Sequence, residues 1–248
     1  MLVPRALDPE RRLPHRVGVF WWGVMVWALN PFWRLEVEGA ERLDAGGPYL
    51  ICSNHQSMMD VLVLMALRSD YKWVSGVRFF KIPMLAMYMR MTGYIAADLR
   101  NPFSAKGILE ECSTWIGKGV SVGLFPEGTR SDSGELGSFK AGAFRVALEN
   151  DVPVLPVAID GTRQIMPKGK WTWLGESPFK TVRVRVLPPI ALSELAQPNA
   201  SELSHAVRNA IGDQLMEWRG PDERAVFGSR GRPSDKGLRV RSNTAATG

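Results

Sequence analysis

The sequence has 248 residues, of which 45% are hydrophobic and 23% charged, and its formal net charge is +6. This length is sufficient for one well-buried α/β domain. The excess of Lys and Arg lies in residues 1–16 and 221–248, while the span between them is nearly neutral. Basic ends on a neutral body suit an anionic membrane surface. Because no aromatic-and-basic nucleic-acid module accompanies the charge, we expect no nucleic acid partner.

The counts of cysteine and histidine argue against two further kinds of site. Cys52 and Cys112 are the only cysteines, and both lie in apolar surroundings, which predicts a reducing cytoplasm and no disulfide framework. His15, His55 and His205 lie far apart in the sequence, so a zinc site is not expected. We expect neither a bound metal nor a cofactor.

The N-terminal region combines a basic arm with an apolar run. Residues 1–16 are polar and basic, and their three prolines argue against a long helix there. Residues 17–29 are uncharged and mostly apolar, but they are fewer than the roughly 20 residues that span a bilayer. A signal peptide and a core helix are alternatives, although no small-residue cleavage site follows the run. Its tryptophans and the arginines before it favour an interfacial, membrane-associating helix.

Strand and helix patterns alternate along the rest of the chain. Short apolar or alternating runs predict strands at 35–39, 49–52, 71–75, 93–97, 120–124, 152–159 and 181–187. Helical patterns predict helices from Ser53 onward, at 103–117, at 139–149 and at 203–218. This alternation predicts an α/β fold with a largely parallel sheet.

The first polar motif is Ser53-Asn54-His55-Gln56-Ser57-Met58-Met59-Asp60, directly after a predicted strand. Ser53 and Gln56 fit a capping box, which predicts that a helix begins at Ser53. Because residues five apart do not share a helix face, His55 and Asp60 can meet only if His55 precedes the helix and Asp60 lies in its first full turn. Asp60 then accepts from one ring nitrogen while the other faces a substrate proton. A purely structural histidine is the alternative.

The second polar motif, Phe125-Pro126-Glu127-Gly128-Thr129-Arg130-Ser131, also follows a predicted strand. Gly128 permits an unusual backbone angle, and Arg130 offers a planar fork suited to phosphate. A turn alone would explain the proline and the glycine, but it would not explain Glu127 and Arg130. The motif therefore indicates a binding function.

Together the two motifs resemble the blocks N-H-x-x-x-x-D and F-P-E-G-T-R-S of the glycerolipid acyltransferase family. A later block of that family, an apolar strand with an inner proline, is similar to residues 152–159. The resemblance covers about residues 35–190 and implies a mixed, largely parallel sheet flanked by helices. It places an acyltransferase domain at 34–220, between the arm and membrane-associating helix (1–33) and a basic tail (221–248) whose composition predicts disorder.

The resemblance implies transfer of a fatty acyl group from acyl-CoA or acyl carrier protein (acyl-ACP) to the sn-2 hydroxyl of 1-acyl-glycerol-3-phosphate. The product would be phosphatidic acid, made for phospholipid biosynthesis at the cytoplasmic face of the cell membrane. In this interpretation His55 is the general base, oriented by Asp60. The expected substrate-binding residues are Asn54, Lys81, Arg100, Glu127, Gly128, Thr129 and Arg130. Alternatives are an acyltransferase for another lysolipid such as a lyso-aminolipid, a thioesterase, and a catalytically silent lipid- or acyl-carrier-binding protein.

The second block of the family is altered in this sequence. Family members usually carry a lysine before a Phe-Lys-Ile-Pro-like segment and an arginine that closes the following strand. Those positions hold Gly76 and Leu99 here, with Arg78 near the first and Arg100 one residue after the second. A one-residue shift on a strand reverses the face of a side chain. Either a local bulge restores that face, or phosphate binding depends more on Arg130 and another cation.

Overall fold

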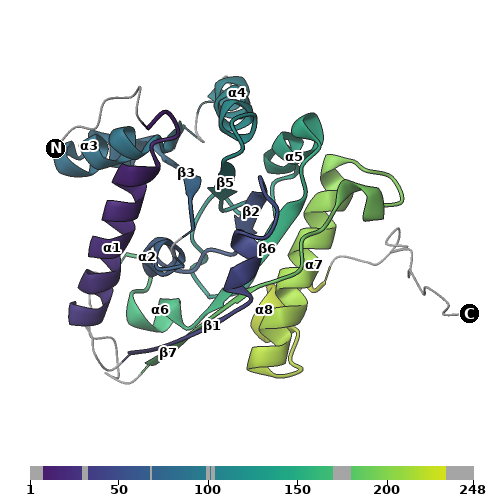
Figure 1. Ribbon diagram of the computed structural model, residues 1–248. Coiled ribbons are helices and arrows are strands. Elements are labelled where there is room, and N and C mark those ends of the chain that lie inside the picture. Colours follow the sequence, from purple (N-terminus) through teal and green to yellow (C-terminus); the bar gives the residue numbers. More distant parts are fainter. Residues whose placement is uncertain are drawn as a thin grey trace, which may run out of the picture.

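The computed structural model describes residues 8–29, 33–67, 69–98, 101, 104–169 and 180–232. Its strands form a central sheet of seven in the order β1-β7-β6-β2-β5-β3-β4 (Figure 1). Neighbouring strands are parallel except for the antiparallel pair β6 and β7. The prediction of a mixed, largely parallel sheet is confirmed. The strands are β1 (Trp33–Glu38), β2 (Leu50–Ser53), β3 (Tyr71–Gly76), β4 (Ile95–Ala97), β5 (Ser121–Leu124), β6 (Val154–Asp160) and β7 (Lys180–Val186).

Helices cover both faces of this sheet. They are α1 (Arg12–Leu29), α2 (Met59–Met65), α3 (Pro83–Thr92), α4 (Ser104–Ile116), α5 (Arg145–Asn150), α6 (Thr162–Ile165), α7 (Ala200–Arg219) and α8 (Arg224–Phe227). Figure 1 shows α1, α2, α3 and α6 on one side and α4, α5, α7 and α8 on the other. Each layer has its own apolar core against the sheet, so the chain is a three-layer α/β sandwich.

The central strand β2 shows why its sequence is a continuous apolar run. Leu50 and Cys52 belong to the core on the α7 side, whereas Ile51 belongs to the core on the α2 side. A strand that is covered on both faces must be apolar at every position. The antiparallel strand β7 is different, because Val182 and Val184 are buried while Arg183, opposite Glu36, pairs with it.

Helix α1 begins earlier than predicted, at Arg12, and includes Pro14 in its first turn. Proline is tolerated at this position because the first N–H groups of a helix have no partner within it. Asp8 supplies the missing acceptors: its carboxylate receives the N–H groups of Arg12 (2.9 Å) and Leu13 (3.0 Å). The expectation that prolines keep the arm out of a helix is therefore wrong from Arg12 onward.

The C-terminal boundary also differs from the prediction. Residues 221–232, expected to be disordered, include α8, whose Val226 and Phe227 are 0% and 3% exposed in the core beside α7. Burial of these two apolar side chains in the core explains why this part of a Gly-, Ser- and Arg-rich segment is ordered. Disorder remains a prediction for residues 233–248, which lie outside the described residues.

Candidate active site

The two polar motifs meet at the carboxyl ends of neighbouring parallel strands. His55 follows β2, Glu127 follows β5, and a third polar residue, Thr162, follows β6 on the other side of β2. From β2 the chain passes over β5 to β3, whereas from β5 it crosses back over β2 to β6. Open α/β sheets bind ligands where the connections diverge in this way. The fold thus places the motifs at a favourable position for a site.

His55 and Asp60 are in direct contact. His55 lies in the loop before α2 and Asp60 in the first turn of this helix, as expected, and Nδ1 of the imidazole is 2.8 Å from Oδ2 of the carboxylate. With Nδ1–H donating to Asp60, Nε2 is the nitrogen that can accept a proton. The His55 side chain is 13% exposed, whereas that of Asp60 is fully buried. A buried carboxylate that orients a partly exposed imidazole can perform acid–base chemistry.

Asp60 is held by three further donors. Its Oδ2 also accepts the backbone N–H groups of Gln56 (2.6 Å) and Ser57 (2.8 Å), and its Oδ1 accepts the hydroxyl of Thr162. Asp60 therefore accepts the free N–H groups that precede α2, whereas the sequence predicted that Ser53 would cap this helix. The capping-box prediction is wrong, because Ser53 is the last residue of β2 and its hydroxyl donates to the carbonyl of Asn54.

The imidazole of His55 is also fixed by an aromatic stack. The ring of Phe125 lies parallel to it, with centroids 3.7 Å apart and an interplanar angle of 6°. Trp73 of β3 packs edge-on against Phe125, with their ring centroids 4.7 Å apart. The sequence interpretation gave Phe125 no role, although it opens the second motif. Together with the hydrogen bond to Asp60, this stacking on Phe125 restricts rotation of the His55 imidazole.

Glu127 joins the second motif to the first. Its Oε1 accepts the backbone N–H of His55 (2.8 Å), and its Oε2 accepts that of Gly137 (3.0 Å). Burial raises the pKa of Glu127 to about 7, and the charge of Asp60 adds to this effect, while the two N–H groups and the charge of Arg208 oppose it. Each carboxylate oxygen has a protein donor, so the geometry supports a positioning role; contact with substrate stays a prediction.

Asn54 is likewise engaged with the protein. Its Nδ2 donates to the carbonyl of Ile159 (2.8 Å) and its Oδ1 accepts the N–H of the same residue (2.8 Å). The side chain, in a residue only 2% exposed, ties the His55 loop to β6. This position explains why the motif needs an asparagine, and it gives no support to the predicted contact with substrate.

Two guanidinium groups come together beside the site. Arg130 is half-buried, and its pKa is lowered by burial and by the nearby charge of Arg78. Within the described part of the chain, neither group has a carboxylate within ion-pair distance. The charges of Asp60 and Asp132 act on Arg130 in the opposite direction, but neither carboxylate pairs with it directly, so both guanidinium groups have donors available for a phosphate.

The other predicted binding residues are less informative. Gly128 has a φ of 71°, which confirms the unusual backbone angle expected of this glycine, and Thr129 is exposed beside it. Lys81 is exposed at the end of the 3₁₀ helix Val77–Lys81. Arg100, like Leu99, lies outside the described residues.

A cleft of about 600 Å³ opens next to the second motif. Its walls come from the segment that includes Glu127 and Arg130, from His205 and Arg208 of α7, and from Phe227 of α8. The C-terminal helices, which lie beyond the region of sequence resemblance, therefore contribute to the surroundings of the site.

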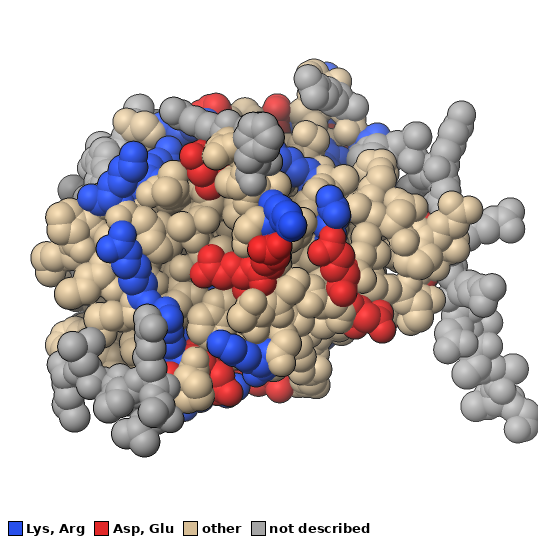
Figure 2. Space-filling model, turned by 90° about the horizontal axis from the view of Figure 1, so that it is seen from above, with Lys and Arg blue, Asp and Glu red and all other residues tan. Residues whose placement is uncertain are grey.

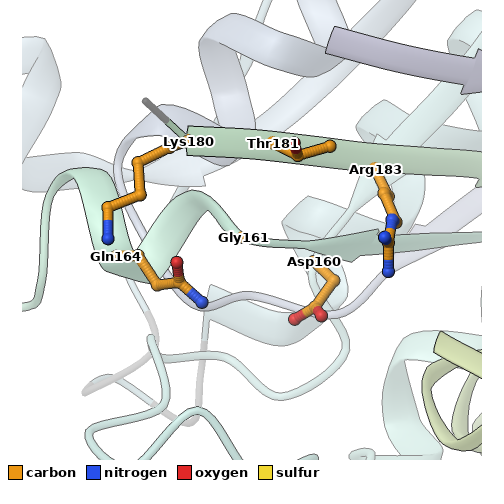
Figure 3. Close-up of a pocket in the computed structure, with 6 residues that line it drawn as sticks. All are labelled: Asp160, Gly161, Gln164, Lys180, Thr181 and Arg183. Carbon is orange, nitrogen blue, oxygen red and sulfur yellow. The ribbon is translucent and has the colours of Figure 1, made fainter. Parts of the chain in front are cut away.

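A smaller pocket of about 270 Å³ lies where β6 ends and the neighbouring strand β7 begins (Figure 3). Figure 3 shows Lys180 extending from β7 toward Gln164, and Arg183 extending from the same strand on the side of Asp160. The Asp160 carboxylate already accepts from Arg219 of α7 (Nε, 3.1 Å). His55 and Asp60 do not line this pocket, but Thr162, the residue after its Gly161, donates to Asp60.

Comparison with known proteins identifies a family and several similar proteins. Residues 34–160 match the family model described as Acyltransferase. The chain is 35% identical over 207 residues to the chloroplastic 1-acyl-sn-glycerol-3-phosphate acyltransferase BAT2 of Brassica napus, covering 83% of this chain and 57% of that protein. It is 36% identical over 210 residues to LPAT1 of Arabidopsis thaliana, with the same described activity, covering 84% of this chain and 56% of that protein.

A solved structure is similar over most of both chains. The crystal structure of the 1-acyl-sn-glycerophosphate (LPA) acyltransferase PlsC from Thermotoga maritima superimposes with a TM-score of 0.69 at 26% identity, covering 83% of this chain and 80% of that one. The chain spans somewhat more than half the length of the two plant relatives. From the matched family model and the shared three-layer fold, the chain belongs to the acyltransferase family.

Proposed function

We propose that the chain transfers a fatty acyl group from acyl-CoA or acyl-ACP to the sn-2 hydroxyl of 1-acyl-glycerol-3-phosphate, giving phosphatidic acid. The activity named for the relatives supports this acceptor. The observation that carries the proposal is the contact between Nδ1 of His55 and Oδ2 of Asp60, because it leaves Nε2 as a base in a site that also holds the guanidinium groups of Arg130 and Arg78.

The chemistry follows from the poor nucleophilicity of a neutral alcohol. As the acceptor hydroxyl attacks the thioester carbonyl, Nε2 of His55 removes its proton, and Asp60 stabilises the imidazolium that forms. Collapse of the tetrahedral intermediate breaks the carbon–sulfur bond, and the departing thiolate takes the proton from His55. An oxygen–carbon bond replaces the carbon–sulfur bond, so no covalent enzyme intermediate is needed.

Arg130 and Arg78 are the cations proposed to bind the acceptor phosphate. Arg130 is separated by only two residues from Glu127, whose carboxylate holds the His55 backbone, so a phosphate on Arg130 brings the glycerol hydroxyls close to His55. Arg78 lies two residues after Gly76, where the family usually has a lysine. Its charge, close to that of Arg130, compensates for the missing lysine in this proposal.

We further propose that α1 rests on the cytoplasmic face of the cell membrane. No helix in the described residues has the length and apolarity to cross a bilayer. Helix α1 buries His15 and Val19 against the domain, yet a second apolar stripe on its surface is 40–61% exposed: Leu13, Val17, Phe20, Trp21 and Val24. Figure 2, seen from above, shows mostly uncharged surface crossed by Lys and Arg on the side where Figure 1 places α1 and α3. An apolar helix among basic residues suits an anionic bilayer.

The test offers a labelled acyl thioester with lysophosphatidic acid, glycerol-3-phosphate and a phosphate-free lysolipid, each in detergent micelles of the same composition. Phosphatidic acid formed from the first acceptor alone is the expected result. Transfer only to the phosphate-free lipid would assign another acceptor, and release of free fatty acid without transfer would indicate a thioesterase.

A further inference from the structure

Arg208 of α7 is a buried arginine that the proposed chemistry does not use. The residue is 6% exposed, and its guanidinium lies over the ring of Phe227 at 4.8 Å from the centroid. Its Nε donates to the carbonyl of Gly137 (2.7 Å), and its Nη2 donates to the carbonyl of Leu136 (2.9 Å). Burying an arginine is costly unless its donors are satisfied, so this side chain must fix the segment that it binds.

The segment that Arg208 binds is the one that holds Glu127. The N–H of Gly137 donates to Oε2 of Glu127, while Oε1 of the same carboxylate accepts the N–H of His55. A side chain at Gly137 would approach Oε2 to 2.7 Å, so the close contact requires glycine at this position. A continuous series of hydrogen bonds therefore runs from α7 through Gly137 and Glu127 to the main chain of His55.

We infer that Arg208 is a positioning residue for acyl transfer: it holds the 136–137 segment against Glu127 and thereby fixes the backbone of His55. The inference rests on the proposed role of His55. Arg208 lies outside the region 34–160 that matches the family model, and it is supplied by the C-terminal part of the domain. In this view α7 is part of the catalytic architecture as well as a cover for the sheet.

Electrostatics supports the same assignment. The positive charge of Arg208 lowers the pKa of Glu127, against the upward effects of burial and of Asp60 in α2. Arg130 and His205 line the same cleft as Glu127 and Arg208. Both N–H groups on Glu127 need an acceptor, and the ionised carboxylate accepts more strongly on each oxygen than a protonated carboxyl, one of whose oxygens becomes a donor. Activity should thus fall as the pH drops through the pKa of Glu127, and removal of the Arg208 charge should move this fall to higher pH.

The test compares Arg208→Met with Arg208→Lys in the full chain. For Arg208→Met we expect kcat to fall about tenfold with little change in the KM of lysophosphatidic acid, since a buried charged donor is lost but no substrate contact. The acidic limb of the pH–rate profile should move up by roughly 0.5–1 on the pH scale. Arg208→Lys keeps the charge but loses the planar fork, so its acidic limb should remain near that of the parent protein.

Arg185→Met provides the matched control. Arg185 of β7 binds Gln214 and Glu217 of α7 and Glu38 of β1, and within the described residues none of these partners contacts Glu127. The second readout is the ¹³C-carboxyl titration of Glu127, assigned with Glu127→Gln. An upward shift in Arg208→Met but not in Arg185→Met supports the hold of Arg208 on Glu127 even if the parent protein transfers no acyl group. Absence of transfer would overturn the proposed function, and with it the catalytic purpose of this hold, but not the link between the two residues. A folded Arg208→Met with an unchanged kcat and titration, or an equal shift in Arg185→Met, would overturn the inference.

Discussion

The carboxylate of Asp60 receives the imidazole of His55 on Oδ2 and the hydroxyl of Thr162 on Oδ1. The ends of two neighbouring strands thus meet at one carboxylate, since His55 follows β2, Thr162 follows β6, and Asp60 lies in the first turn of α2. Asp60 is fully buried, and its four donors leave it suited to remain an acceptor. The proposed role of His55 as the base depends on this carboxylate, which holds the imidazole through Nδ1.

Replacement of Thr162 by valine tests the second support of Asp60. The change keeps the shape of the side chain but leaves Oδ1 of a buried carboxylate without its hydroxyl donor, a loss of about 1–3 kcal/mol. We expect kcat to fall about tenfold and the midpoint of urea unfolding to decrease. Thr181→Val, on an exposed position of β7, is the matched control and should leave both quantities unchanged. Equal activity of the two variants would remove Thr162 from the site.

Arg130→Ala tests the phosphate contact. Loss of a charge-assisted bond should raise the KM for lysophosphatidic acid roughly 10–100-fold and leave that for a phosphate-free lysolipid nearly unchanged. Arg145→Ala, which removes an exposed arginine paired with Glu149, is the control. If the KM values for both acceptors rise together, Arg130 acts on the structure of the site and not on the phosphate.

Gly76→Lys tests the altered second block by gain of function. Gly76 has φ −59° and ψ 134°, a backbone conformation open to any residue, and a Cβ added there would lie 3.9 Å from its nearest neighbours, an ordinary contact distance. We expect a several-fold lower KM for lysophosphatidic acid, because a third cation joins Arg78 and Arg130. Gly76→Ala adds the Cβ without the charge. A gain seen equally in the alanine variant would show that rigidity, and not charge, is responsible.

Phe20→Gln combined with Trp21→Gln tests the membrane surface of α1. Both side chains are about 60% exposed, so their loss should leave the fold intact while it weakens binding to anionic vesicles at least tenfold. Leu35→Gln changes an apolar side chain of β1 that is 40% exposed and serves as the control. Undiminished sedimentation of the double variant with the vesicles would contradict an interfacial role for α1.

The sequence was sufficient to predict the sheet and the meeting of His55 with Asp60. Buried parallel strands are short apolar runs, and the distance of five residues allowed only one geometry for the pair. The details of the helix start were not predictable in the same way. Ser53 fits a capping box by type and spacing, but the strand extends through it, and Asp60 satisfies the N–H groups instead. The capping preference of Ser53 is not realised because the carboxylate of Asp60 is a better acceptor for these N–H groups.

The site residues that come from distant segments were not identified from the sequence. Thr162 and Arg208 reach the site only because β6 and α7 pack beside β2 and the second motif. A signal for Thr162 existed, since it is a polar residue directly after a buried strand, as are the two motifs. Arg208 gave no such signal in an otherwise amphipathic helix. The helix predicted at 139–149 begins as the 3₁₀ helix Ala141–Phe144 and becomes α-helical only at Arg145, a distinction that hydrophobic spacing does not encode.

The most direct test of the account is acyl transfer by His55→Ala, measured beside the parent protein with a labelled thioester and lysophosphatidic acid. Removal of a general base should lower kcat by about 10²–10⁴-fold while circular dichroism and the unfolding midpoint stay close to those of the parent. A folded His55→Ala protein that forms phosphatidic acid at the parent rate would contradict the assignment of His55 as the base.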